Sequence, residues 1–257
     1  MGDILLLPRG PYMKKLTLVS LNHYFKLVLR GGLFLTAVVL YITQWHGNPN
    51  APFGHETDSL FLMIVWALGL AEVISRFFPS KLESMGCQKV FSKNYQPLVT
   101  ERTDNKADIR CSVAFVGGIW IAFNAVFGIL YLKGILDTGF MYVLCLFYSV
   151  CDMICILFFC PFQSWFMKNR CCTTCRIYNW DFPMMWTPMI FVGGWYGLSL
   201  LIPSLVLLAR WEYVARKYPE RFSVTANACL KCSNCPEKLC HHKKQLLPLW
   251  KRIKPKF

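Results

Sequence analysis

Five apolar segments dominate the chain, and each approaches or exceeds the length needed to cross a lipid bilayer. They cover residues 24–45, 59–78, 111–132, 139–162 and 184–209. A membrane-spanning helix needs about 20 apolar residues. Hydrophobic residues make up 55% of the chain and charged residues only 16%, which excludes a disordered chain and disfavours a soluble domain. The sequence therefore predicts an all-α, polytopic integral membrane protein with about five hydrophobic helices.

Basic residues are unevenly distributed around these segments, and their distribution predicts the orientation of the chain. The N-terminal arm, up to Arg30, carries five Lys and Arg residues, the loop 46–58 carries none, and the stretch 76–110 carries seven. Because cytoplasmic loops are enriched in Lys and Arg, we expect a cytoplasmic N-terminus, in the cytoplasmic membrane if the protein is bacterial. The net charge of +14 follows from this pattern and requires no nucleic-acid partner.

The last apolar segment leaves the side of the C-terminus open, because an odd number of crossings places the two termini on opposite sides of the membrane. Five crossings from a cytoplasmic N-terminus place the C-terminus outside, yet residues 210–256 carry twelve Lys and Arg. Either the last segment crosses and the tail is extracytoplasmic, or one segment does not cross. Three glycines and a proline within residues 193–203 permit a broken or re-entrant path. We favour a cytoplasmic tail, and we divide the chain into a membrane domain, 1–209, and a short, basic, Cys-rich tail, 210–257.

The tail contains the most specific motif in the sequence. Its form is C-x2-C-x2-C-P-x3-C, followed by two histidines, and its cysteines are Cys229, Cys232, Cys235 and Cys240. Cysteines separated by two residues can present both sulfurs to one metal centre, which suits iron–sulfur clusters and tetrahedral zinc alike. Over about a dozen residues the motif resembles the cysteine run of bacterial ferredoxins, although its last gap and its proline differ. Disulfide bonds are a further alternative and require an extracytoplasmic tail.

A second group of cysteines, Cys171, Cys172 and Cys175, follows the fourth apolar segment. We predict these thiols as a second ligand set, with palmitoylation as the alternative because a span ends nearby. If both groups face the cytoplasm, their seven thiolates exceed the needs of one zinc ion and suit a [4Fe–4S] cluster. Four further cysteines within the fourth segment are expected to be small packing residues. They are Cys145, Cys151, Cys155 and Cys160.

Several other residues are candidates for a site. Asp152 lies near the middle of the fourth segment, where a carboxylate is costly, so it is a candidate proton carrier. Glu72 precedes Arg76 by four residues, a spacing that lets the two pair along a helix. Tyr178 and Trp180 lead into the last segment. They suit an aromatic belt at the membrane interface, and with the neighbouring cysteines they could line a quinone pocket.

Two functions of different classes fit these features. The first is a membrane-bound redox protein, in which a cysteine-ligated iron–sulfur centre passes electrons between a soluble electron-transfer protein and the membrane, with quinone as the candidate acceptor. The alternative is a transporter or assembly factor whose cysteines bind structural zinc and whose functional acids are Asp152 and Glu72. A lipid-modified or disulfide-bonded scaffold without a cofactor is a third option. The sequence contains no P-loop, G-x-S-x-G or H-E-x-x-H motif that identifies an enzyme.

Overall fold

The computed structural model describes residues 17–46, 52, 56–98, 106–167, 171–235 and 237, and within them the secondary structure is helical. The α-helices are α1 (Leu18–Leu40), α2 (Glu56–Ser75), α3 (Met85–Gln88), α4 (Lys106–Leu132), α5 (Thr138–Leu157), α6 (Asp181–Trp186), α7 (Met189–Val192) and α8 (Gly194–Lys217). Two π-helical turns are η1 (Tyr41–Trp45) and η3 (Phe162–Phe166). Short 3-10 turns are η2 (Ser92–Asn94), η4 (Tyr178–Trp180), η5 (Pro219–Phe222), η6 (Ala228–Leu230) and η7 (Cys232–Asn234).

Four of the described helices are long and apolar enough to cross a membrane. They are Leu18–Trp45, Cys111–Leu132, Thr138–Leu157 and Gly194–Lys217, and α2 adds a shorter apolar stretch. Large hydrophobic side chains such as Val28 and Trp195 are 75% and 82% exposed on the outer faces of the bundle. Such an apolar exterior suits contact with lipid. The prediction of an all-helical membrane protein is confirmed at this level.

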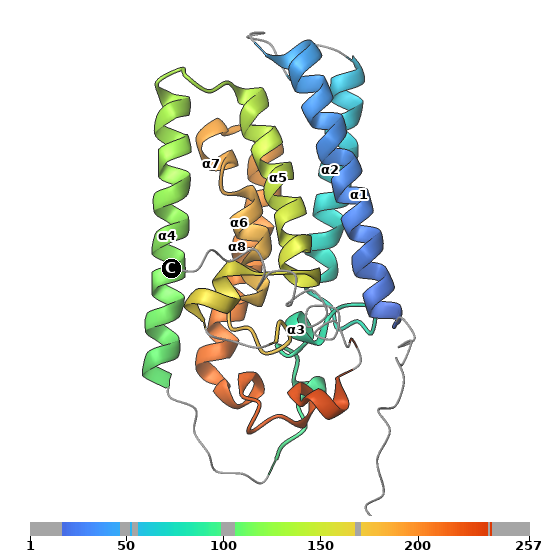
Figure 1. The fold of residues 1–257 in the computed structure, drawn as a ribbon, viewed down its shortest axis with the longest axis vertical. Coiled ribbons are helices and arrows are strands. Elements are labelled where there is room, and N and C mark those ends of the chain that lie inside the picture. The colour runs from blue at the N-terminus through green and yellow to red at the C-terminus, as the bar shows by residue number, and fades with distance from the viewer. Residues whose placement is uncertain are drawn as a thin grey trace, which may run out of the picture.

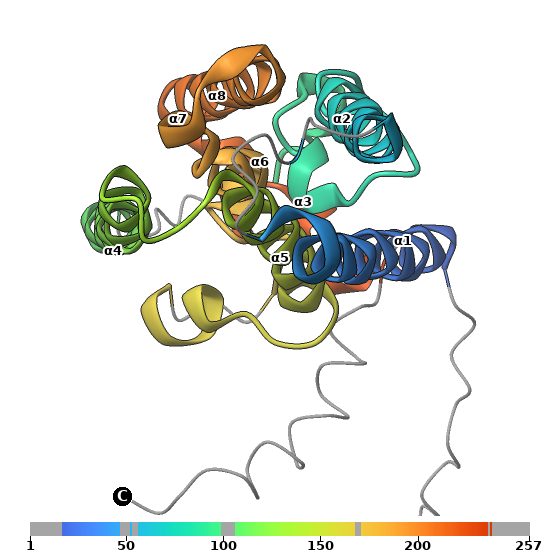
Figure 2. The same ribbon diagram turned by 90° about the horizontal axis from the view of Figure 1, so that it is seen from above.

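The helices form an upright bundle around α5. Seen from above, α5 lies at the centre, with α1 on one side and α6 on the other, while α4 stands at the edge (Figure 2). The side chain of Trp186 from α6 is buried against α2, where Gly69 leaves room for its ring: a Cβ at Gly69 would lie 2.9 Å from it. Asp137 begins α5 by accepting a hydrogen bond from the Phe140 N–H at 2.7 Å.

The last apolar segment is a hairpin of helices. α6 and α7 pack against α8, and the chain reverses between them at Gly193 (Figure 1). Gly193 has φ 68° and ψ −153°, a conformation that is essentially restricted to glycine. The predicted irregularity therefore lies at this glycine, whereas α8 continues through Pro203 without a break. Because of the hairpin, the residues on either side of this segment lie at the same end of the bundle.

Three segments gather at that end, and we call them the cap: residues 76–98, 171–180 and 218–235. Two backbone hydrogen bonds join the first segment to the third, from Leu98 to Ala226 at 3.0 Å and from Ala228 to Gln96 at 2.9 Å. The cap lies beside the start of α1, at the lower end of the bundle in Figure 1. Both cysteine-containing segments, as far as the structure describes them, therefore lie at one end of the molecule.

A buried carboxyl group fastens the tail to α3 and α1. Glu237 accepts hydrogen bonds from the Met85 N–H at 2.5 Å and from the Ser84 hydroxyl at 2.8 Å, at the start of α3. The Ser20 hydroxyl of α1 donates to the Glu237 carbonyl at 2.8 Å. Burial raises the pKa of Glu237 above its ordinary value, although the bonds from Ser84 and Met85 act in the opposite direction. The tail thus connects two elements that are far apart in the sequence.

Candidate functional site

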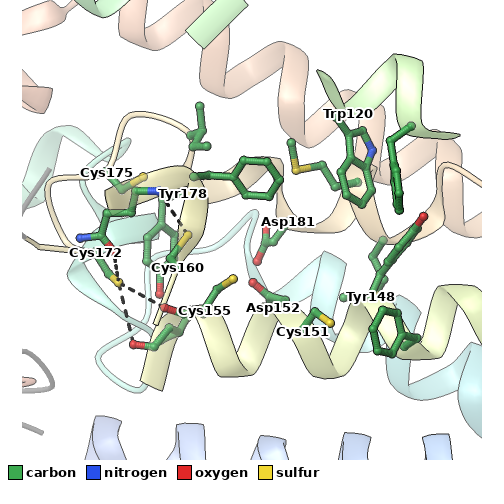
Figure 3. A pocket seen from close by; sticks show the side chains of 18 residues that line it. Trp120, Tyr148, Cys151, Asp152, Cys155, Cys160, Cys172, Cys175, Tyr178 and Asp181 are labelled. Carbon is green, nitrogen blue, oxygen red and sulfur yellow. Dashed lines mark hydrogen bonds between the residues drawn. The ribbon is translucent and has the colours of Figure 1, made fainter. Parts of the chain in front are cut away.

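A cavity of about 280 Å³ lies between α4, α5, α6 and the segment that follows α5 (Figure 3). Aromatic and aliphatic side chains form most of its wall, and thiols and carboxyl groups form the remainder. The cysteines and acids that line it are Cys151, Asp152, Cys155, Cys160, Cys172, Cys175 and Asp181. Four residues predicted from the sequence for three separate roles meet here: Asp152, Cys172, Cys175 and Tyr178.

Several thiols on the cavity wall are linked by hydrogen bonds, either directly or through Gln163. The Cys155 and Cys160 side chains are hydrogen bonded. The Gln163 N–H donates to the Cys160 sulfur at 3.4 Å, and the Cys172 thiol donates to the Gln163 side-chain oxygen at 3.1 Å. Residues from the end of α5 and from the second cysteine group therefore form one side of the cavity.

The cysteines of the fourth apolar segment separate into two environments. Cys145 is buried in the core, as expected of a packing residue. Cys151, Cys155 and Cys160 line the cavity, a role that the sequence argument did not assign to them. A signal existed in the sequence, because Cys151 and Cys155 are four residues apart and so share a helical face beside Asp152.

Asp152 is paired deep in the bundle. Its Oδ2 accepts a hydrogen bond from Arg30 at 2.9 Å, and Arg30 also donates to Glu72 at 2.5 Å. The Arg30 side chain is only 6% exposed. A charge that interrupts the first apolar segment of the sequence thus lies inside the bundle, between two acids, and does not face lipid.

Further ion pairs extend from Glu72 towards the cap. Lys26 lies 4.0 Å from Glu72 and 2.7 Å from Glu83. Arg76 lies 3.5 Å from Glu83 and 2.8 Å from Asp181, so it contacts these acids in place of the expected helical neighbour Glu72. Burial acts to raise the pKa of Glu83, but Arg76 and Lys26 outweigh burial, and this pKa lies below its ordinary value.

Tyr178 and Trp180 occupy different surroundings. Tyr178 lines the cavity, whereas Trp180 is not among its lining residues. The Trp180 indole donates to Glu212 at 2.9 Å, and Glu212 also pairs with Arg176 at 2.6 Å. Trp180 therefore connects η4 to α8, and of the two predicted quinone-contacting aromatics only Tyr178 faces the cavity.

A buried lysine joins the second cysteine group to the first segment of the cap. Lys89 donates to the carbonyl oxygens of Thr173 and Cys175, at 3.0 and 2.7 Å. Burial lowers the pKa of Lys89 to about 8. Two aromatic rings, Trp211 and Phe222, each lie 5.3 Å from its ammonium group, which favours the charged form.

The tail cysteines lie near the surface of the cap. Asn227 accepts a hydrogen bond from the Cys229 N–H at 3.1 Å, while Cys232 is exposed and Cys235 is half-buried. Cys240 and the two histidines after it lie outside the described residues. Within the part of the chain that the structure describes, no group of three or more His, Cys, Asp or Glu side chains is arranged to hold a metal ion. Metal ligation by these cysteines therefore stays a prediction.

Comparisons with known proteins do not assign this site. Family models, curated proteins and solved structures give no match to the chain. The function must therefore be inferred from the cavity, from the groups that line it, and from the position of the cysteine segments at one end of the bundle.

Proposed function

We propose that the protein is a membrane-bound redox protein that transfers electrons between a soluble donor and a quinone-class acceptor in the membrane. The observation that carries this proposal is the convergence of Asp152, Tyr178, Cys172 and Cys175 on one cavity. Ligand sites are typically concave and mostly apolar, with a few polar groups that orient the ligand. The cavity has these properties, and its volume of about 280 Å³ is near the lower end of the usual range.

In this proposal the electrons enter through a cysteine-ligated iron–sulfur cluster at the cap. The principal ligands are Cys229, Cys232, Cys235 and Cys240, and the second ligand set is Cys171, Cys172 and Cys175. Co-operation of the two groups requires that they lie on the same side of the membrane. The hairpin at Gly193 and the hydrogen bonds within the cap support this requirement. Basic residues in both segments would stabilise thiolates and an anionic cluster.

The same arrangement supports a cytoplasmic cap. The cap segment 76–98 carries Lys and Arg, and the start of α1, which follows the basic N-terminal arm, lies at the same end. We therefore propose a cytoplasmic N-terminus and tail, with about five hydrophobic segments of which the last enters and returns as a hairpin. A reducing cytoplasm keeps thiols available for metal ligation. The soluble partner would meet the protein at this end.

Metal analysis tests the proposal. Protein purified anaerobically in detergent should contain iron and acid-labile sulfide in near-equal amounts, with visible absorption that bleaches on reduction. The double substitution Cys232→Ser with Cys235→Ser should remove both. Cys111→Ser is the matched control, because Cys111 is an exposed thiol on α4, and it should leave both unchanged. Colourless, iron-free protein with intact cysteines would contradict the proposal.

The buried ion pairs favour a second candidate function. Glu72 and Asp152, the two acids of the transporter or assembly-factor hypothesis, both bind Arg30. In this case the cysteines hold structural zinc and the acids carry the function. Zinc without iron, retained in Asp152→Asn while function is lost, would favour this candidate over electron transfer.

A further inference from the structure

The buried and half-buried ion pairs form one continuous chain of alternating charge. Each member lies within 4.0 Å of the next, and together they connect α1, α2, α5, α6 and the cap. In order, the members are Asp152, Arg30, Glu72, Lys26, Glu83, Arg76 and Asp181. The chain therefore contains four carboxylates and three cations, and it begins and ends with an acid.

Both ends of this chain reach the cavity. Asp152 and Asp181 line its wall, and their carboxyl groups point towards one another in Figure 3. The Asp181 side chain is only 4% exposed, and its Oδ1 is buried without a hydrogen-bond partner in the described structure. Every other junction in the chain joins opposite charges, whereas this one brings two like charges together.

The charge count favours one additional positive charge at this junction. With all seven members ionised, four carboxylates against three cations leave one net negative charge in a largely buried cluster. His23 is a further titratable group beside the cluster, but it interacts with Lys26, Glu83 and Arg76 and is not among the groups that act on Asp181. The charged groups that act on Asp181 are Arg76, Asp152 and Arg30, and the two arginines already bind other acids. An uncompensated buried charge costs several kcal/mol. Two neighbouring carboxyl groups avoid this cost by sharing one proton.

We propose that Asp152 and Asp181 form a carboxyl pair that holds one exchangeable proton facing the cavity. This assigns a role to Asp181, and it makes Asp152 one half of a two-residue proton site. The site follows from the charge count and the geometry, so it exists whether or not the protein transfers electrons. Its ligand class is a molecule with an oxygen that accepts a hydrogen bond from the protonated carboxyl.

In the proposed redox function, that oxygen belongs to the quinone. Reduction of a quinone to a quinol consumes two electrons and two protons. The pair donates one proton to a quinone oxygen and becomes fully ionised, and water supplies the second proton and reprotonates the pair. The proposed cysteine-ligated centre would supply the two electrons one at a time, after two successive reductions by the soluble donor. This step alone depends on the redox proposal.

Infrared spectroscopy tests the proton site without quinone or metal. A protonated carboxyl group has a C=O stretching band that shifts in D₂O. Glu237 is another buried carboxyl with a raised pKa, so the measurement uses Glu237→Gln as the parent protein. At neutral pH this parent should show one protonated carboxyl per molecule. Asp181→Asn leaves three carboxylates against three cations, so the band should fall to zero.

Two further variants make the result decisive. Asp152→Asn should abolish the band in the same way, and it serves if Asp181→Asn fails to fold. Glu212→Gln is the matched control, because Glu212 pairs with Arg176 outside the chain, and it should retain the band. Absence of the band in the parent, or its persistence in both Asp variants, would overturn the proposal. Neither result changes the iron and sulfide measurement, so the two proposals fail independently.

Discussion

At the scale of single residues, the buried charges are the main determinants of this structure. Arg30 binds Glu72 and Asp152 and is almost fully buried. Removing one partner of a buried ion pair leaves an uncompensated charge, which costs about 3–5 kcal/mol. The substitution Arg30→Met leaves both acids without this cation, so we expect a loss of stability at the upper end of this range.

Thermal unfolding in detergent measures this loss. Arg216→Met is the control, because Arg216 is exposed at the end of α8, and its effect should stay within about 0.5 kcal/mol. Adding Glu72→Gln to Arg30→Met should recover part of the loss, since one stranded charge disappears. Equal stability of the Arg30 and Arg216 variants would show that the buried pairs contribute nothing.

The lowered pKa of Lys89 predicts how the stability of the folded protein changes with pH. Burial lowers its pKa to about 8 from the ordinary 10.5. Below about pH 8 the group is charged in both folded and unfolded protein, and burial destabilises the fold. Between about 8 and 10.5 the folded protein releases this proton first, so stability should rise with pH by roughly 3 kcal/mol relative to Lys89→Met. Parallel unfolding curves for wild type and Lys89→Met across this window would contradict the assignment, and the exposed Lys93→Met serves as control.

At the scale of elements, the hairpin of the last apolar segment depends on two adjacent glycines with positive φ, Gly193 and Gly194. Gly193 has φ 68°, and a Cβ there would contact nothing within 4 Å, so the cost of a side chain is purely conformational. Gly193→Ala should therefore destabilise the protein by about 1–3 kcal/mol. A Cβ added at Gly118 would also contact nothing within 4 Å, but Gly118 lies inside α4, where alanine is favoured over glycine by about 1 kcal/mol. The midpoint of thermal unfolding should therefore fall for Gly193→Ala and rise for Gly118→Ala. Equal shifts of the two midpoints would disprove the role of Gly193.

The docking of the tail depends on Glu237 and on pH. Because folding raises the pKa of Glu237, its contribution to docking is fully present below the ordinary pKa and is lost as pH rises through the folded value. Hydrogen exchange at residues 228–235 should therefore slow as the pH falls, after correction for the intrinsic exchange rate. Glu237→Gln should remove this pH dependence, and Glu237→Ala should speed exchange at every pH. Identical pH profiles for wild type and Glu237→Gln would contradict the prediction.

At the scale of the whole molecule, the sequence predicts the helices well and their contacts poorly. Apolar runs locate the spans, because a long run of hydrophobic residues needs no partner to be recognised. The site depends instead on contacts between distant residues: Arg30 and Asp152 are 122 positions apart, and Arg76 and Asp181 are 105 apart. Composition and spacing carry no information about which helix faces meet. Only the three-dimensional structure therefore shows that the separately predicted residues share a cavity.

The topology also belongs to this scale. The cap and the α4–α5 turn lie at opposite ends of the bundle (Figure 1). In a Cys111→Ser background, which removes an exposed native thiol, the substitutions Lys93→Cys and Lys133→Cys should therefore react with a membrane-impermeant thiol reagent from opposite sides. Labelling of both engineered positions from one side would contradict the arrangement.

The most direct test of the proposed function is quinone reduction by the protein itself. Protein reduced anaerobically and freed of reductant is mixed with a short-chain quinone, and quinol formation is followed by ultraviolet absorbance. We expect wild type to form quinol and to become oxidised, and Cys232→Ser with Cys235→Ser to form none. Asp152→Asn should slow the reaction by about 100-fold or more, as expected for loss of a proton donor. A reduced wild-type protein that leaves the quinone unchanged would contradict electron transfer as its function.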